Sequence, residues 1–137
     1  MLDQTDLSIL ALLRENSRLQ WKDIGEKVHL SGQAVGNRIR RMEEQGIIQG
    51  YTAVIDNARI GPALTAIVTM FMKTTDHQKF TRFVSARPEV AEAHRISGEG
   101  CYALFVSVPD QAALNAFLDE LLPFGNYKVN LSIGKIK

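Results

Sequence analysis

The 137-residue chain is poor in cysteine, proline and tryptophan, with one, four and one of each. The single cysteine, Cys101, cannot build an intrachain disulfide framework or a cysteine-rich zinc site. No apolar run approaches the roughly 18 residues of a membrane span. The N-terminus has no cationic segment leading into an apolar one, so it does not resemble a signal peptide. Because 45% of the residues are hydrophobic, a globular cytoplasmic protein is the expectation.

Sequence patterns of catalytic and metal sites are also missing. The three histidines, His29, His77 and His94, lack the spacing of metal ligands. Only His94 stands near Cys101 as a base, and no glycine-rich phosphate loop or Ser-His-Asp arrangement occurs. We therefore expect no enzymatic activity, no metal and no cofactor.

The net charge of +1 is low for a protein that binds nucleic acids. Residues 1–60 carry eight basic and eight acidic side chains. Residues 31–41, by contrast, contain Arg38, Arg40 and Arg41 and no acid, a local charge of +3. DNA binding would therefore depend on a focused patch that oligomerisation repeats.

Residues 30–48, LSGQAVGNRIRRMEEQGII, have the pattern of a capped amphipathic helix. Ser31 is a good N-cap, and Gly46 is placed to end the helix. One face of this helix gathers the apolar residues Val35, Ile39 and Met42. The opposite face gathers Gln33, Asn37 and Arg40.

Amide and guanidinium groups read base edges and contact phosphates in the major groove of DNA. The candidate DNA-binding residues are Ser31, Gln33, Asn37, Arg38, Arg40 and Arg41. We expect Gln33, Asn37 and Arg40 to approach the bases, and Arg38 and Arg41 to bind phosphate beside them.

Two residues near this helix have open interpretations. Gly36 could admit a neighbouring backbone, either from the preceding helix or from DNA. Trp21 is expected to cover part of the core, with a contact to the DNA backbone as the alternative.

The segment before the candidate recognition helix is helical in pattern. Asp3 and Asp6 resemble a capping box for a first helix. A second helix covers about residues 21–28, and residues 29–31 form a tight connection to the third. Residues 47–55 are β-prone and could form a short strand or wing. This order predicts a winged helix-turn-helix over residues 1–56. A plain helical bundle is the alternative, but it does not explain why the exposed face of the third helix lacks acids before Glu43.

Residues 57–63, with Gly61 and Pro62, are the expected linker. After it, residues 64–137 alternate as strand, helix, strand, strand, helix and strand. That order is typical of a ferredoxin-like βαββαβ unit, which has a four-stranded sheet with both helices on one face. The predicted fold class is therefore α+β.

The first predicted strand, residues 64–74, is apolar on both of its faces. Whichever face meets the helices, the other is expected to be too apolar for water. We therefore predict a homodimer that pairs two sheets through residues 64–137.

Several motifs together resemble the Lrp/AsnC family of leucine-responsive, or feast/famine, transcription regulators. They are LDQTDLSILALLRENSR, LSGQAVGNRIRRMEEQGII and the SGEGCY loop of the βαββαβ half. The resemblance covers essentially the whole chain. It implies an N-terminal winged helix-turn-helix that binds double-stranded DNA, a C-terminal domain for amino-acid-responsive regulation, and dimers that commonly assemble to octamers on bent or wrapped DNA.

The resemblance also implies an effector site at subunit contacts near one loop. The corresponding residues here are Ser97, Gly98, Glu99, Gly100, Cys101 and Tyr102. Many effector-responsive members have an acid where this chain has Cys101, and a thiol is a poorer partner for an ammonium group. Glu99 could substitute for that acid.

Three alternative functions remain open from the sequence. They are a ligand-independent architectural DNA-binding protein, an amino-acid sensor whose helical module contacts protein, and a dimeric ferredoxin-like enzyme with a helical appendage. The enzyme would need a pocket with converging titratable groups, which the sequence does not indicate.

Overall fold

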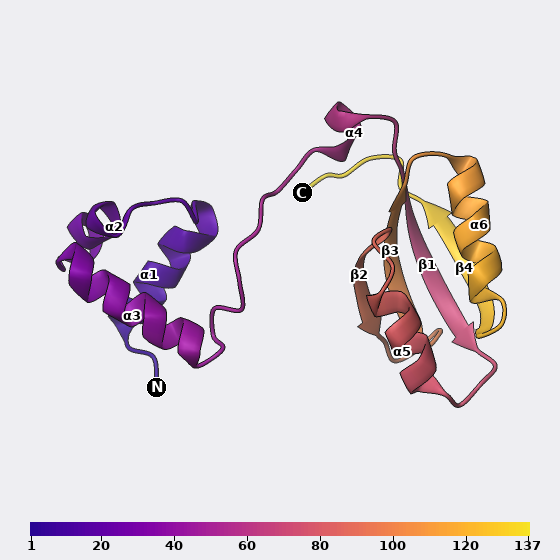
Figure 1. Ribbon diagram of the computed structural model, residues 1–137, viewed down its shortest axis with the longest axis horizontal. Helices are drawn as coiled ribbons and strands as arrows, with labels where there is room; N and C mark the ends of the chain where they lie inside the picture. Colours follow the sequence, from indigo (N-terminus) through magenta and orange to yellow (C-terminus); the bar gives the residue numbers. More distant parts are fainter. The chain divides into compact units, whose positions relative to one another are not determined.

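The computed structural model describes all 137 residues, which divide into two compact units, residues 1–54 and 55–137 (Figure 1). The N-terminal unit contains three helices, α1 (Gln4–Glu15), α2 (Trp21–Val28) and α3 (Gly32–Glu44). The predicted helix-turn-helix order is confirmed. One apolar residue of α1, one of α2 and three of α3 form a core in which no member is more than 3% exposed: Ile9, Ile24, Val35, Ile39 and Met42.

The helix ends of this unit follow the caps expected from the sequence. Asp3 and Asp6 form a reciprocal capping box at the start of α1, with N–H to carboxylate distances of 2.8 and 3.0 Å. The hydroxyl of Ser31 accepts the N–H of Ala34 at 3.1 Å at the start of α3. At the other end of α3, Gly46 has a φ of 70° and the N–H of Ile47 donates to the carbonyl of Met42. This is a Schellman-type ending, which requires the left-handed residue that glycine supplies.

The turn between α2 and α3 is tight because His29 has a left-handed backbone and Gly25 leaves room for the chain that follows. His29 adopts the left-handed conformation, with a φ of 59°. The N–H of Leu30 then donates to the carbonyl of Gly25 at 3.0 Å. A Cβ on Gly25 would lie 2.3 Å from the oxygen of Leu30, so no side chain fits there.

The expected wing is wrong: residues 47–56 form no strand. A β-prone run needs a neighbouring strand to satisfy its backbone, and this unit supplies none. Ile48 packs against the core, but the later apolar side chains of this run remain exposed, with Val54 at 90% and Ile55 at 57%. The expected linker likewise contains one helical turn, α4 (Asn57–Ile60), capped by the side chain of Asp56.

The C-terminal unit is a four-stranded antiparallel sheet covered on one face by two helices (Figure 1). After α4, its elements in chain order are β1 (Leu64–Met72), α5 (His77–Ser85), β2 (Val90–Arg95), β3 (Tyr102–Val108), α6 (Gln111–Leu121) and β4 (Gly125–Leu131). The strands lie in the order β2-β3-β1-β4. This arrangement confirms the predicted ferredoxin-like α+β fold.

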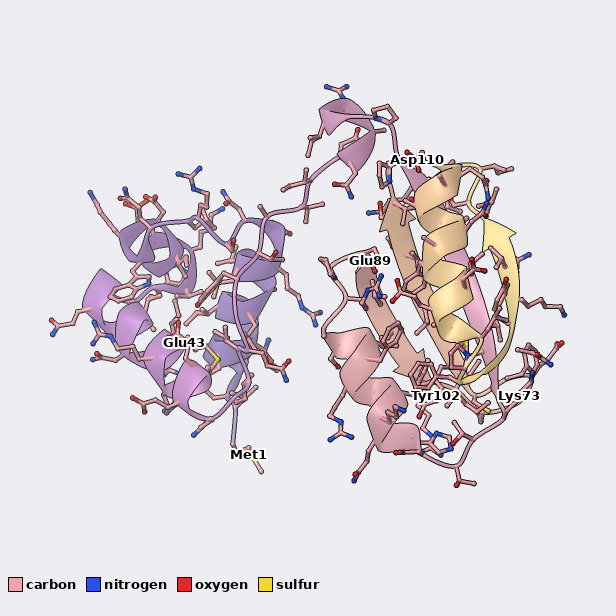
Figure 2. All side chains as sticks on the ribbon, turned by 45° about the vertical axis from the view of Figure 1, so that its right-hand side comes forward. Met1, Glu43, Lys73, Glu89, Tyr102 and Asp110 are labelled. Atoms are coloured by element: carbon pink, nitrogen blue, oxygen red, sulfur yellow. The ribbon has the colours of Figure 1, made fainter.

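The core of this unit lies between the sheet and its helices (Figure 2). Alternate residues of β1 and β3, including Val68, Met70 and Leu104, are fully buried there. They meet Phe80 of α5 and Phe117 of α6, each 1% exposed. The period-two pattern of the strands and the apolar stripes of the helices therefore face each other, as binary patterning requires.

The opposite face of the sheet is apolar mainly around the middle of its two central strands. Ile67 of β1 lies directly across from Phe105 of β3, and Ile67 is 37% exposed. The outer strands carry polar residues on this face, among them Lys128 on β4 and Glu92 and His94 on β2. The expectation of a face too apolar for water therefore holds for a central strip and not for the whole sheet.

No helix in the chain is long and apolar enough to cross a membrane.

Candidate nucleic-acid interface

The outer face of α3 has the composition predicted for a recognition helix. Gln33, Asn37 and Arg40 are exposed. The opposite face, with Val35 and Ile39, is buried in the core of the N-terminal unit. Three hydrogen-bonding side chains are therefore free to approach a ligand without disturbing the packing of α3.

One of these three, Arg40, is held by an aromatic ring. Its guanidinium carbon lies 5.1 Å from the centroid of the Trp21 ring, a cation–π contact that orients the side chain. The same ring packs on Gly36, where a Cβ would lie 2.3 Å from Cε3 of Trp21. The space at Gly36 is thus filled by a side chain of α2. Trp21 still has 39% of its surface exposed.

The other two arginines of α3 point to α1. Nη1 of Arg38 donates to Oδ2 of Asp3 at 2.7 Å and to Oδ1 of Asp6 at 2.9 Å. Nη2 of Arg41 donates to both carboxylate oxygens of Asp6, at 3.1 and 2.9 Å. We call the side chains of Asp3, Asp6, Arg38 and Arg41 the α1–α3 ion cluster.

Asp6 is the centre of this cluster and is fully buried. Its carboxylate accepts from the backbone of Asp3 and from both guanidinium groups, so the buried charge has a complete set of donors. The hydrogen bond from Arg38, followed by that from the backbone of Asp6, lowers the pKa of the Asp3 carboxyl. Hydrogen bonds to Asp3 and Asp6 raise the pKa of Arg38. Asp3 and Arg38 are therefore held in their charged forms at neutral pH.

The ion cluster changes the charge of the predicted DNA-binding patch. Two arginines and two aspartates add to zero, so the local +3 predicted for residues 31–41 falls to +1 in the folded unit. Arg40 is the one arginine of α3 that pairs with no carboxylate. Arg38 and Arg41 keep 27% and 49% of their side-chain surface exposed, and phosphate binding by them stays a prediction.

A further cation lies beside the start of α3. A Cβ on Gly32 would lie 3.2 Å from the backbone nitrogen of Lys22, so the first turns of α2 and α3 are in close contact there. Lys22 is exposed and pairs with no acid. The sequence does not indicate Lys22, because only the turn geometry brings it close to the candidate recognition helix.

The candidate effector loop is a tight hairpin between β2 and β3. Gly98 and Gly100 have φ angles of 92° and 89°. A Cβ on Gly100 would lie 2.5 Å from Cγ2 of Thr69, so the loop packs directly on β1. The N–H of Cys101 donates to the carbonyl of Met70 at 2.7 Å and fixes the end of the loop.

The predicted effector residues do not converge on one cavity within the chain. Ser97, Gly98 and Glu99 are exposed at the outer end of the hairpin. Glu99 pairs with Lys128 at 3.0 Å. Tyr102 points the other way, into the helix-covered side of the sheet. The role of all six residues in effector binding stays a prediction.

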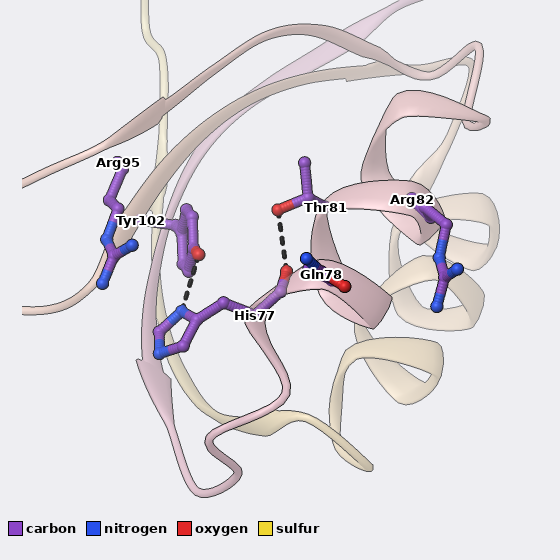
Figure 3. A pocket seen from close by; sticks show the side chains of 6 residues that line it. All are labelled: His77, Gln78, Thr81, Arg82, Arg95 and Tyr102. Carbon is purple, nitrogen blue, oxygen red and sulfur yellow. Dashed lines mark hydrogen bonds between the residues drawn. The ribbon is translucent and has the colours of Figure 1, made fainter.

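Tyr102 lines a hollow of about 450 Å³ beside α5 that the sequence did not predict (Figure 3). Its lining residues are His77, Gln78, Thr81, Arg82, Arg95 and Tyr102. The hydroxyl of Tyr102 lies 2.7 Å from Nδ1 of His77. No group of three or more His, Cys, Asp or Glu side chains is placed to hold a metal ion.

Comparison with family models assigns both halves of the chain. Residues 2–43 match the AsnC-type helix-turn-helix domain, and residues 65–137 match the Lrp/AsnC ligand binding domain. The chain is 48% identical to the HTH-type transcriptional regulator LrpB of Bacillus subtilis, over 99% of this chain and 91% of that protein. It is 35% identical to LrpA of the same organism, over 98% of this chain and 100% of that protein.

Solved structures give the same result. The structure of B. subtilis LrpC matches with a TM-score of 0.91 and 30% identity, over 100% of this chain and 98% of that chain. The transcriptional regulator NMB0573 of Neisseria meningitidis, solved as a complex with L-Met, matches with a TM-score of 0.90 and 28% identity. That match covers 100% of this chain and 93% of the other.

Proposed function

Because the chain belongs to the Lrp/AsnC family of transcription regulators, we propose that it binds duplex DNA as a dimer-based oligomer and responds to a small molecule such as an amino acid. The observation that carries the proposal is the outer face of α3, where Gln33, Asn37 and Arg40 are exposed over a buried apolar face. The relatives are transcriptional regulators and not enzymes.

In this proposal the residues of α3 have unequal roles on DNA. Asn37 and Gln33 read base edges, since a side-chain amide both donates and accepts hydrogen bonds. Arg40, held over Trp21, contacts a base or a phosphate. Lys22 contacts phosphate next to the start of α3.

Ser31, Arg38 and Arg41 complete the proposed interface from its edges. The hydroxyl of Ser31 caps α3 and fixes the first turn of the helix. The N–H groups of Arg38 and Arg41 that the ion cluster leaves unused can reach phosphate. Their main contribution is to hold α3 against α1.

The proposed dimer follows from the low charge of each N-terminal unit. One unpaired arginine on α3 gives little electrostatic affinity, because each phosphate contact contributes separately to binding. Two recognition helices about 34–36 Å apart meet successive turns of the major groove on one side of the duplex. The central apolar strip of the sheet, around Ile67 and Phe105, supports pairing of two C-terminal units. Assembly to octamers would multiply the contacts further.

The proposed effector is an amino acid bound at subunit contacts near residues 97–102. The related regulator from N. meningitidis was solved with L-Met. Because Cys101 has a thiol in place of a carboxylate, Glu99 is the acid of this loop that could bind the effector's ammonium group, and it would have to leave Lys128 to do so. An effector would act by binding one assembly state more tightly than another.

Selection of DNA ligands from random duplexes tests the recognition helix directly. Asn37→Ala is expected to relax base preference at one position, by about 1–3 kcal/mol. Asn115→Ala is the matched control, because Asn115 is exposed on α6 of the other unit. An unchanged base preference in Asn37→Ala would remove Asn37 from the reading face.

A ligand-independent architectural DNA-binding protein is the second candidate function. It is favoured by the thiol at Cys101 and by the Glu99–Lys128 pair, which leave the loop without an unpaired acid. A thermal-shift screen of the twenty amino acids separates the two candidates. A stabilising amino acid whose effect is lost in Glu99→Gln supports the effector-responsive regulator, and the absence of any stabilising amino acid supports the architectural protein.

A further inference from the structure

The hollow beside α5 is lined by cations and by no acid. Arg82 comes from α5 and Arg95 from the end of β2, and neither pairs with a carboxylate. Both side chains are exposed. Two guanidinium groups beside one hollow raise the local concentration of anions there.

The middle of the hollow, in contrast, is fixed by hydrogen bonds within the protein. Tyr102 is 7% exposed, and its hydroxyl bonds to Nδ1 of His77. The hydroxyl of Thr81 donates to the carbonyl of His77 at 2.7 Å. Figure 3 shows Arg95 and Arg82 on opposite sides of these residues. The two guanidinium groups therefore remain available at the two ends of a preformed surface.

We propose that this hollow binds a small organic acid that carries two carboxylates and no ammonium group. A guanidinium group binds a carboxylate through two parallel hydrogen bonds, so a ligand with two carboxylates has one for each arginine that lines the hollow. The lining contains no acid to pair with an ammonium group. A volume of about 450 Å³ is sufficient for such a ligand.

This site is distinct from the amino-acid site proposed at residues 97–102, although Tyr102 connects the two. Tyr102 follows Cys101, whose N–H is bonded to the carbonyl of Met70. The Tyr102 ring also packs on Phe80, with centroids 4.6 Å apart. A ligand in the hollow therefore lies beside the residue that follows the hairpin loop.

Isothermal titration of the full-length protein with 2-oxoglutarate and succinate tests the proposal. L-glutamate is the matched ligand, since it has the carbon skeleton of 2-oxoglutarate and adds an ammonium group. We expect both dicarboxylates to bind, and L-glutamate to bind roughly tenfold more weakly than 2-oxoglutarate, or worse. Arg82→Gln and Arg95→Gln are each expected to weaken dicarboxylate binding by roughly tenfold.

Lys79→Gln is the control variant, because Lys79 is an exposed cation of α5 that does not line the hollow. It is expected to bind both dicarboxylates as the unmodified chain does. Three results would overturn the proposal: no binding of either dicarboxylate at about 10 mM, equal affinity for L-glutamate, or an equal loss in Lys79→Gln.

The outcome is separable from that of the proposed DNA binding. Arg82 and Arg95 lie in the C-terminal unit, outside the helix-turn-helix. A gel shift without any organic acid is therefore expected to give the same DNA affinity for Arg82→Gln, Arg95→Gln and the unmodified chain. Failure of DNA binding would leave the titration result unaffected.

Discussion

Replacing Asp6 by alanine removes the carboxylate that joins α1 to α3. The variant loses the hydrogen bonds from the backbone of Asp3, from Arg38 and from Arg41. Removing one partner of a fully buried ion pair costs about 3–5 kcal/mol, because the remaining charge is left buried. Here Arg38 and Arg41 are 27% and 49% exposed, so water can solvate them again and part of that cost disappears. We therefore expect the N-terminal unit to lose about 2–3 kcal/mol of unfolding free energy.

Trp21 makes the measurement selective, because it is the only tryptophan of the chain and lies in α2. Urea unfolding followed by its fluorescence reports on the N-terminal unit alone. Glu26→Ala is the matched control, because Glu26 is exposed on α2 of the same unit and pairs with no cation, with an expected change within about 0.5 kcal/mol. A loss for Asp6→Ala no larger than that of Glu26→Ala would refute the conclusion that the ion cluster holds α3 in place.

Three other predictions concern single groups in the N-terminal unit. Arg38 lowers the pKa of Asp3 in the folded state. The stability that this pair provides is therefore present above the unfolded pKa near 3.9 and is lost as the pH falls through the lower folded pKa. Acid unfolding followed by Trp21 fluorescence is expected to begin at higher pH in Asp3→Asn, which lacks this stability at every pH. Partial desolvation, followed by the hydrogen bond to Glu43, raises the pKa of Tyr51 to about 12, although 52% of its surface is exposed. Ultraviolet titration is therefore expected to lose a component near pH 12 in Tyr51→Phe, and loss of a component near the ordinary tyrosine value of about 10 would contradict the raised pKa. His29→Gly is expected to raise the urea midpoint by the equivalent of about 0.5–1 kcal/mol, because glycine adopts a φ of 59° without the cost that a side chain imposes.

Local patterns in the sequence were sufficient to predict most of the fold. The apolar spacing of Val35, Ile39 and Met42 places one face of α3 in the core, and their burial confirms it. The wing failed because β-propensity describes how a residue fits into a sheet and does not provide the neighbouring strand. Residues 47–56 have the composition of a strand and no partner within the unit.

The candidate sites were harder to predict, because they depend on residues far apart in the chain. Arg38 and Arg41 looked like free cations in a window of eleven residues, although their partner Asp6 lies more than thirty positions away. Asp6 also looked like an ordinary capping residue, and only the packing of α3 on α1 gives it a second role. The hollow in the C-terminal unit is lined by Arg82 of α5 and Arg95 of β2, and no local sequence pattern indicates that these two residues lie near the same surface.

Some side chains of α3 point to solvent and others hold the helix against α1, and this difference affects how such a regulator can evolve. Gln33, Asn37 and Arg40 project from the unit without joining its core, so substitutions there cost the fold little. Arg38, which follows Asn37, and Arg41, which follows Arg40, are tied to α1 through Asp6, so a change at either one disturbs the packing of α3 on α1. A duplicated copy of this chain could therefore acquire a new DNA target through a few outward substitutions while its scaffold stays intact.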